Sequence, residues 1–261
     1  MDNRPVGMFD SGVGGLSVLR HFQRLAPNER VVYFADTAWF PYGPRPAAEV
    51  RKRAFAITRR LLESDVKLII VACNTASAAA IADLRQAFDV PFVGMVPGVK
   101  PAASRSRAGH VAILATPGTL DGDLYARVVE EFGRGTKISS VPGYGLAELV
   151  EDGGAESEEA HARLRELLGP ADRAGADTVV LGCTHYHFLG AAIAAEFPGL
   201  AIVDTSEAVA RRAVQVLDDG GLRARADAPG GIDLIVSGDH AAFRAAMARL
   251  GFEPAHAEAT A

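Results

Sequence analysis

Two stretches decide the fold of this chain: KLIIVACNTAS at residues 67–77 and TVVLGCTHY at residues 178–186. Each is a run of mostly aliphatic residues that ends in a cysteine and continues with small polar residues. The runs have the length of a buried strand, and the polar residues stand where that strand would end. The two stretches hold the only two cysteines of the sequence, Cys73 and Cys183. A chain that uses cysteine so sparingly therefore places both in the same local setting.

Outward from these stretches, short apolar runs alternate with longer segments of helical periodicity. Runs that are apolar throughout are typical of strands buried on both faces, and hence of parallel sheets covered by helices. We predict an α/β fold with mainly parallel sheets flanked by helices. Strands are expected at residues 31–35, 67–72, 91–96, 110–115, 137–141, 178–182, 200–204 and 233–237, with a strand-like segment before Asp10. Helices are expected at residues 16–26, 48–64, 77–88, 122–133, 156–175, 188–197, 206–220 and 240–251.

The carboxyl ends of parallel strands are where such sheets form their ligand sites. Both cysteines, Asp10, Asp36 and Thr116 are predicted to stand at such ends. Asp10 precedes Cys73 by nearly the same number of residues as Thr116 precedes Cys183, so the two halves of the chain have a similar order of strand ends. We predict two similar domains with the active site in the cleft between them and one thiol from each. The expected domains are residues 1–97 plus 207–261, and residues 98–206, with a disordered tail at 254–261.

Composition limits the classes of function. The 261 residues carry a formal net charge of −5, so no large basic surface for nucleic acid is expected. The basic stretch at residues 51–60 is interrupted by a helical stripe of apolar residues, which predicts the solvated face of an amphipathic helix. That stripe is Val50, Ala54, Ile57 and Leu61. No run approaches the roughly 18 apolar residues of a membrane span, and the N-terminus lacks a secretion signal. We expect a cytoplasmic protein with free thiols.

The loop DSGVGG at residues 10–15 is the most polar cluster near the N-terminus. It lacks the Lys of a phosphate-binding loop and the third glycine of a dinucleotide fingerprint, so nucleotide binding is not favoured. Its glycines predict tight turns and a ligand close to the backbone. The alternative is a plain turn between strand and helix, with Ser11 capping the helix that begins at residue 16.

The segment CTHYH at residues 183–187 suggests a metal as an alternative. On an extended chain Cys183, His185 and His187 would share one side, but no second cysteine pair lies nearby and no metal site is predicted. A redox dithiol is a further alternative, although Cys-x-x-Cys is absent. Two inert core cysteines would not need the polar residues that follow each of them.

The residues around the thiols supply a different chemistry. Asn74, Thr75 and Thr184 offer hydrogen-bond donors that would bind a carboxylate, and they provide a polar setting in which a thiolate could form. Asp10 and His185 could orient and tune one thiol each.

At this point the sequence resembles the glutamate racemases of the cofactor-independent aspartate/glutamate racemase superfamily. The resemblance covers most of the chain and rests on blocks in the family's order. These blocks are FDSGVGGLSVLR, FADTAWFPYG, VACNTASA, VPGVKPAA, ATPGT, ELVEDG, LGCTHY and VSGDHAAF.

The resemblance implies racemisation of glutamate without pyridoxal phosphate. One cysteine, as a thiolate, would remove the Cα proton while the other delivers a proton to the opposite face. Cys73 would act on D-glutamate and Cys183 on L-glutamate, assisted by Asp10 and His185. The product would supply D-glutamate for bacterial cell-wall peptidoglycan, and a homodimer is expected.

Further roles are implied position by position. Asp10 and Ser11 would bind the substrate near its amine, while Pro41, Tyr42 and Gly43 would surround the side-chain carboxylate. Asn74, Thr75 and Thr184 would hold the α-amino and α-carboxylate groups, and His185 would also bind the substrate. Thr116 and Thr119 would add contacts from the second domain. Asp36 and Glu151 would tune the site.

Three positions depart from the family's pattern: Trp39, where arginine is common, His187, where proline is common, and Val141, where cysteine is frequent. Trp39 and His187 are expected close to the cleft. No cofactor is expected, since Lys52, Lys67, Lys100 and Lys137 are the only lysines and none follows a phosphate-binding loop.

Three alternatives remain open. One is a racemase for aspartate or another acidic amino acid. A second is a metal- or redox-binding protein that uses Cys73, Cys183, His185 and His187. A third is a non-catalytic inhibitor of a partner protein, which would need neither cysteine.

Overall fold

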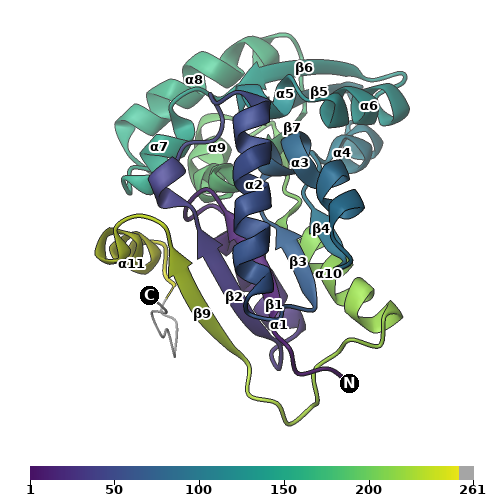
Figure 1. Cartoon of the computed structure of the whole chain (residues 1–261). Helices are drawn as coiled ribbons and strands as arrows, with labels where there is room; N and C mark the ends of the chain where they lie inside the picture. Colours follow the sequence, from purple (N-terminus) through teal and green to yellow (C-terminus); the bar gives the residue numbers. More distant parts are fainter. Residues whose placement is uncertain (253–261) are drawn as a thin grey trace.

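The structure is a computed structural model that describes residues 1–252. It contains two parallel sheets, drawn in the lower and upper halves of Figure 1. Within the described residues the first sheet has five strands in the order β4-β3-β1-β2-β9. These strands are β1 (Val6–Asp10), β2 (Arg30–Ala35), β3 (Leu68–Val71), β4 (Phe92–Gly94) and β9 (Gly231–Val236).

The second sheet repeats the topology of the first. Its order is β6-β5-β7-β8, so β5 lies between the two strands that follow it, as β1 does in the first sheet. These strands are β5 (His110–Ala115), β6 (Lys137–Pro142), β7 (Thr178–Gly182) and β8 (Ala201–Val203). A crevice opens where consecutive connections leave a strand on opposite sides. In the two sheets that point lies beside β1 and β3, and beside β5 and β7.

The eight expected helices are present in the described residues. They are α1 (Leu16–Leu25), α2 (Ala47–Leu62), α3 (Asn74–Ala87), α6 (Asp123–Phe132), α8 (Glu158–Arg173), α9 (Gly190–Glu196), α10 (Ser206–Asp219) and α11 (His240–Arg249). Five short elements were not expected, because each offers too few turns to show a helical period. They are α4 (Val99–Arg105), α5 (Pro117–Leu120), α7 (Leu146–Glu151) and the 3₁₀ helices η1 (Thr37–Trp39) and η2 (Thr184–Leu189). The predicted fold class, two α/β domains with parallel sheets, is confirmed.

The two halves share a core. One continuous cluster of buried apolar side chains includes Met8 on β1, Leu114 on β5 and Ala213 on α10. Helix α10 packs along α1, so the chain returns to the first sheet after it has completed the second. The cleft between the sheets is therefore built on a common apolar base.

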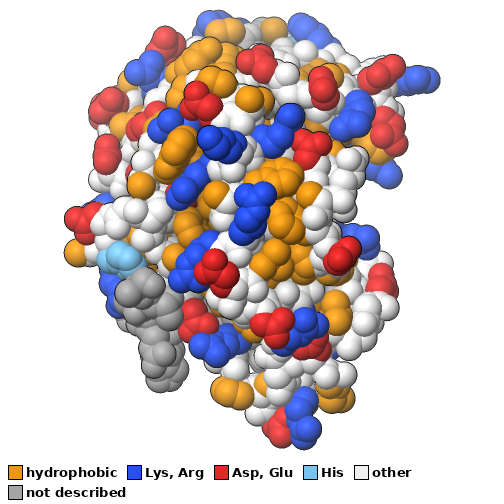
Figure 2. All heavy atoms as spheres, in the orientation of Figure 1, with side chains coloured by type: hydrophobic (Ala, Val, Ile, Leu, Met, Phe, Trp, Pro, Cys, Tyr) orange, Lys and Arg blue, Asp and Glu red, His pale blue; other side chains and the backbone are white. Residues whose placement is uncertain are grey.

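Helix α2 is amphipathic and carries the basic stretch at residues 51–60. Val50, Ala54, Ile57 and Leu61 are buried, as the apolar stripe predicts. Figure 2 shows Lys and Arg side chains on this face of the molecule interspersed with acidic and apolar ones. Arg53 is an exception, because it is only 23% exposed and pairs with a buried carboxylate.

No helix in the described part of the chain is long and apolar enough to cross a membrane. The segment 254–261, for which a disordered tail is predicted, lies outside the described residues.

Candidate active site

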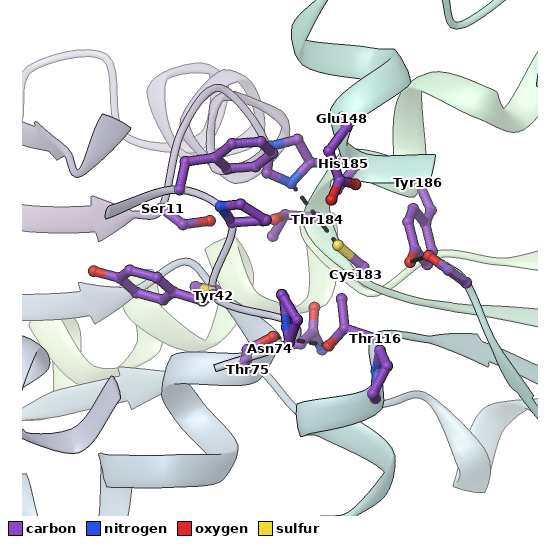
Figure 3. Close-up of a pocket in the computed structure, with 18 of the residues that line it drawn as sticks. Ser11, Tyr42, Asn74, Thr75, Thr116, Glu148, Cys183, Thr184, His185 and Tyr186 are labelled. Atoms are coloured by element: carbon purple, nitrogen blue, oxygen red, sulfur yellow. Dashed lines mark hydrogen bonds between the residues drawn. The ribbon is translucent and has the colours of Figure 1, made fainter. Parts of the chain in front are cut away.

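One cavity between the two sheets is lined by both cysteines. Cys73 follows β3 and immediately precedes α3, whereas Cys183 follows β7 and immediately precedes η2. Both are free thiols, 5% and 8% exposed. Figure 3 shows the cavity with Cys183 facing a space bounded by Thr116, Asn74, Thr184 and His185. The parallel topology therefore brings together two thiols that lie 110 positions apart, at residues 73 and 183.

The environment of Cys73 opposes its ionisation. Burial raises the pKa of the thiol well above its usual value, and the nearby Asp10 charge raises it further. The backbone N–H groups of Ala76 and Thr75, in the first turn of α3, lower this pKa in part. A helix N-terminus favours an anion, so a thiolate at Cys73 would form against these N–H groups.

Cys183 belongs to a chain of hydrogen-bonding groups. Its Sγ lies 3.8 Å from His185 Nδ1. On the other side of the ring, His185 Nε2 lies 2.8 Å from Glu151 Oε1, which also accepts a hydrogen bond from Val13 N at 2.7 Å. Burial lowers the pKa of His185, but the hydrogen bonds to Cys183 and Glu151 outweigh it and raise the pKa well above the usual value. A protonated His185 can donate to a thiolate at Cys183 while Glu151 fixes the ring.

The glycines of residues 12–15 leave room for the side chains of this hydrogen-bonded chain, because they have no Cβ atom. A Cβ at Gly12 would lie 1.8 Å from Glu151 Oε1, and one at Gly14 would lie 2.4 Å from Thr184 Oγ1. The loop has no positive φ angle at these positions. At Gly12 and Gly14 the space that a Cβ would take is thus filled by side chains of α7 and η2.

Asp10 lies behind the cavity. Its carboxylate is fully buried and accepts hydrogen bonds from Gly12 N at 2.8 Å and from Thr184 Oγ1 at 3.1 Å. Burial raises the pKa of Asp10 to about 6, although the His185 charge and the Gly12 N–H oppose the shift. No side chain caps α1, so the alternative in which Ser11 caps this helix is wrong. The intervening loop places Ser11 on the cavity wall instead.

The buried Asp10 predicts a stability change with pH. Its pKa is raised from 3.8 to about 6 in the folded protein, so ionisation of Asp10 favours the unfolded state. The loss of stability is absent below about pH 4, grows as the pH rises toward 6 and is complete above that pH. Two pKa units correspond to about 3 kcal/mol. Asp10→Asn should thus raise the free energy of unfolding by about 1–3 kcal/mol at pH 8 and leave it unchanged at pH 4.

Urea unfolding of parent and variant at the two pH values measures this difference. Other titratable groups contribute equally to the pH dependence of both proteins, so their effect cancels in the difference. An Asp10→Asn variant that is less stable than the parent at both pH values would show that the hydrogen bonds of the carboxylate outweigh its desolvation.

The cavity offers neutral hydrogen-bonding groups. Asn74 is 2% exposed, and its amide Nδ2 and Oδ1 have no hydrogen-bond partner. Thr75 Oγ1 lies 2.8 Å from Thr116 Oγ1, which lies 2.9 Å from Thr119 Oγ1, so hydroxyl groups bridge the two halves. Among the described residues that line the cavity there is no Lys and no Arg. An anionic ligand would be held here by amide, hydroxyl and backbone donors.

The structure places most of the predicted site residues on the cavity wall. Those that line it are Ser11, Pro41, Tyr42, Gly43, Cys73, Asn74, Thr75, Thr116, Cys183, Thr184 and His185. Asp10, Thr119, Asp36 and Glu151 are not part of the wall. Each of these four instead hydrogen bonds to a residue that is: Thr184, Thr116, Tyr42 and His185, respectively.

One alternative for the cleft is wrong. Residues 184–189 form a 3₁₀ helix, so Cys183, His185 and His187 do not share one side of an extended chain. His187 hydrogen bonds to Asp204. Neither it nor Trp39 lines the cavity, although their chain neighbours Tyr186 and Phe40 do. Trp39 packs against Arg45 and Arg53. No group of three or more His, Cys, Asp or Glu side chains in residues 1–252 is arranged to hold a metal ion.

Part of the cavity wall was not predicted from the sequence. Phe40, Tyr144, Glu148 and Tyr186 also line the cavity. Tyr186 donates to Gly143 O at 2.7 Å, and a Cβ at Gly143 would lie 2.4 Å from the Tyr186 hydroxyl oxygen. The motif PGYG at residues 142–145, an aromatic residue between two glycines after a strand, was the available signal.

Comparison with known proteins agrees with this geometry. The profile of the Asp/Glu/hydantoin racemase family matches residues 11–213. A glutamate racemase from Deinococcus radiodurans is 45% identical over 249 residues, which cover 94% of this chain and 86% of the relative.

Solved structures give the same result. A glutamate racemase from Thermus thermophilus in complex with beta-chloro-D-alanine superposes with a TM-score of 0.87 at 37% identity, covering 100% of this chain and 98% of its own. One from Francisella tularensis in complex with D-glutamate has a TM-score of 0.86 at 28% identity, with coverage of 100% and 98%. Taken with the two-thiol cavity, these matches show that the chain belongs to the Asp/Glu/hydantoin racemase family.

Proposed function

We propose that this protein is a glutamate racemase that inverts Cα by proton transfer between Cys73 and Cys183. The observation that supports this most strongly is the single cavity lined by one thiol from each sheet. Inversion needs a base on one face of Cα and an acid on the other, and the two sheets supply one sulfur each. The names of the relatives at about 45% identity favour glutamate as substrate.

The proposed reaction conserves protons. A thiolate at Cys73 takes the Cα proton of D-glutamate, and the Cys183 thiol gives its proton to the opposite face. The product is L-glutamate, and the enzyme is left with a thiol at Cys73 and a thiolate at Cys183, ready for the reverse reaction. His185 would stabilise that second thiolate, since it lies 3.8 Å from the sulfur. The Asp10 charge raises the pKa of Cys73, so a thiolate at Cys73 would be harder to form and a stronger base toward the Cα proton.

The protein must hold two carboxylates although no Lys or Arg lines the described cavity wall. We propose that Asn74, Thr75 and Thr184 bind the α-carboxylate and α-amino groups, and that Ser11 contributes nearby. The backbone of Pro41, Tyr42 and Gly43 would receive the side-chain carboxylate. Neutral donors in a water-poor site hold an anion strongly and leave its charge available to the reaction.

No cofactor enters this proposal. A pyridoxal phosphate enzyme needs a lysine amine for a Schiff base, and the described cavity wall has no lysine. Lys67 is buried in an ion pair with Glu29, 2.6 Å away, outside this wall. The thiols themselves would carry the proton.

The experiment is the loss of optical rotation of L-glutamate with purified protein in a chelator and without pyridoxal phosphate. Racemisation under these conditions is the expected result. Activity on aspartate alone would transfer the assignment to a racemase of another acidic amino acid. Loss of activity on chelation, or a requirement for added cofactor, would contradict the two-thiol reaction.

Asn74 provides a more local test. Its side-chain amide has no hydrogen-bond partner among residues 1–252, so Asn74→Ala should change the free energy of unfolding by less than about 1 kcal/mol. The same change should raise KM for glutamate by about tenfold or more, because a donor to a substrate carboxylate is lost. Urea unfolding and steady-state kinetics separate the two effects. An unchanged KM would show that the amide does not bind substrate.

We further propose domain limits of 1–97 plus 207–261, and 98–206. The strands support this division, since β9 at Gly231–Val236 joins the first sheet and β5 to β8 form the second. A homodimer, a cytoplasmic location and a role in supplying D-glutamate for peptidoglycan also remain proposals that follow from the family.

A further inference from the structure

A buried ion pair lies beside the loop that forms one wall of the cavity. Asp36, at the end of β2, is fully buried. Arg53 on α2 donates to both of its oxygens, from Nε to Oδ2 at 2.7 Å and from Nη2 to Oδ1 at 2.6 Å. This two-pronged geometry fixes direction as well as charge. The guanidinium is the group that compensates the buried carboxylate.

The Asp36 carboxylate also binds Tyr42, a residue of the cavity wall. The hydroxyl of Tyr42 donates to Asp36 Oδ2 at 2.5 Å. In Figure 3 the Tyr42 ring extends away from Cys183, so its hydroxyl is directed out of the cavity. Burial and the Asp36 charge raise the pKa of Tyr42 far above its usual value, and the hydroxyl stays a donor. The side chain of Tyr42 thus serves as an anchor.

The next residue is fixed from the other side. Gly43 O accepts a hydrogen bond from Gly118 N, on α5 of the second half, at 3.0 Å. Earlier in the loop, Arg45 Nε donates to Trp39 O at 2.9 Å. Both guanidinium groups also lie over the Trp39 ring, Arg45 at 5.1 Å and Arg53 at 5.4 Å from its centroid. The Tyr42–Gly43 segment is thus held by Asp36 through the Tyr42 hydroxyl and by Gly118 through the Gly43 carbonyl.

We propose that Arg53 is a positioning residue for substrate recognition. It acts through Asp36 and Tyr42 to hold the Tyr42–Gly43 backbone where the side-chain carboxylate of the substrate binds. The inference rests on the proposed function, and it extends the site to a helix that does not touch the cavity. Because the described wall has no Lys or Arg, and its His185 is engaged with Cys183 and Glu151, affinity for the far carboxylate depends on the exact placement of backbone donors.

The test compares steady-state kinetics of four variants with the parent. Arg53→Met leaves Asp36 buried without a cation, so KM for glutamate should rise about tenfold or more while kcat changes less than about threefold. Arg53→Lys should recover part of the loss, since it restores the charge without the two-pronged contact. Arg60→Met is the matched control on the same helix, because Arg60 pairs with the exposed Glu63 and does not line the cavity. Its KM should equal that of the parent.

The double variant Asp36→Asn/Arg53→Met isolates the mechanism. An asparagine oxygen still accepts from the Tyr42 hydroxyl, and no charge is left buried, so KM should return to within about threefold of the parent. The single tryptophan, Trp39, gives a second readout: its emission should shift in Arg53→Met and not in Arg60→Met. If Arg53→Met fails to fold, Arg53→Lys and the double variant provide the comparison.

Three outcomes would overturn the inference while the proposed function stands. They are an active Arg53→Met variant with the parent's KM, a loss confined to kcat, or a double variant no better than the single one. A parent without activity on glutamate would overturn the proposed function itself, and this inference with it.

Discussion

Cys73→Ala and Cys183→Ala should each lower the rate of glutamate racemisation by at least about 10³-fold, because each removes the acid or base on one face of Cα. Both sulfurs line the same cavity and come from opposite sheets, so neither can replace the other. The measurement is the loss of optical rotation at saturating L- and D-glutamate. Thermal unfolding of each variant would show whether the fold is retained, which is expected because the thiols make no disulfide.

Each cysteine variant should keep the ability to exchange the Cα proton of one enantiomer. In deuterium oxide, Cys183→Ala should exchange the Cα proton of D-glutamate without inversion, since Cys73 still removes and returns a proton on that face. Cys73→Ala should exchange only L-glutamate. Proton NMR of the Cα signal follows both reactions. Exchange of the same enantiomer by both variants, or racemisation by either at the parent's rate, would refute the assignment of one face to each thiol.

His185→Gln should lower kcat/KM by about 10²-fold, within the range expected for a group that assists proton transfer. The imidazole lies 3.8 Å from Cys183 Sγ and 2.8 Å from Glu151 Oε1, so its removal leaves a thiolate at Cys183 without a cationic donor. The matched control is His187→Gln, two residues along the same 3₁₀ helix. His187 is hydrogen bonded to Asp204 and does not line the cavity. The kcat/KM of the His187→Gln variant should therefore change less than about threefold.

The two directions of the His185→Gln reaction carry a further expectation. Enantiomers have equal free energies, so kcat/KM must fall equally for L- and D-glutamate. The slowed step is proton removal by Cys183, so the primary isotope effect of Cα-deuterated L-glutamate should increase and that of the D-enantiomer should decrease. Isotope effects that change equally in both directions would place His185 outside the Cys183 side of the reaction.

The sequence predicts the fold because its strongest signals are local. Aliphatic runs such as residues 67–72 and 178–182 can satisfy their backbone groups and bury both faces only inside a parallel sheet. The polar residue after each run then has to stand at the carboxyl end of a strand. This is why Cys73, Cys183 and Thr116 could be assigned to one cleft, while short elements such as α7 and η2, with too few turns for a period, were not expected.

The alternation of strands and helices, the repeated placement of the two thiols with their polar neighbours, and the likeness to a family are all visible in the amino-acid sequence. Which side chains face the cavity and which support it from outside the wall is visible only in the folded protein. Asp10 and Asp36 both end strands in the sequence, yet both turn out to be buried supports of Thr184 and Tyr42. The sequence shows the hydrophobic periodicity that predicts helices and strands. The direction of a buried carboxylate depends instead on partners that are distant in sequence, such as Arg53 for Asp36. Those partners meet only when helices and sheets have packed.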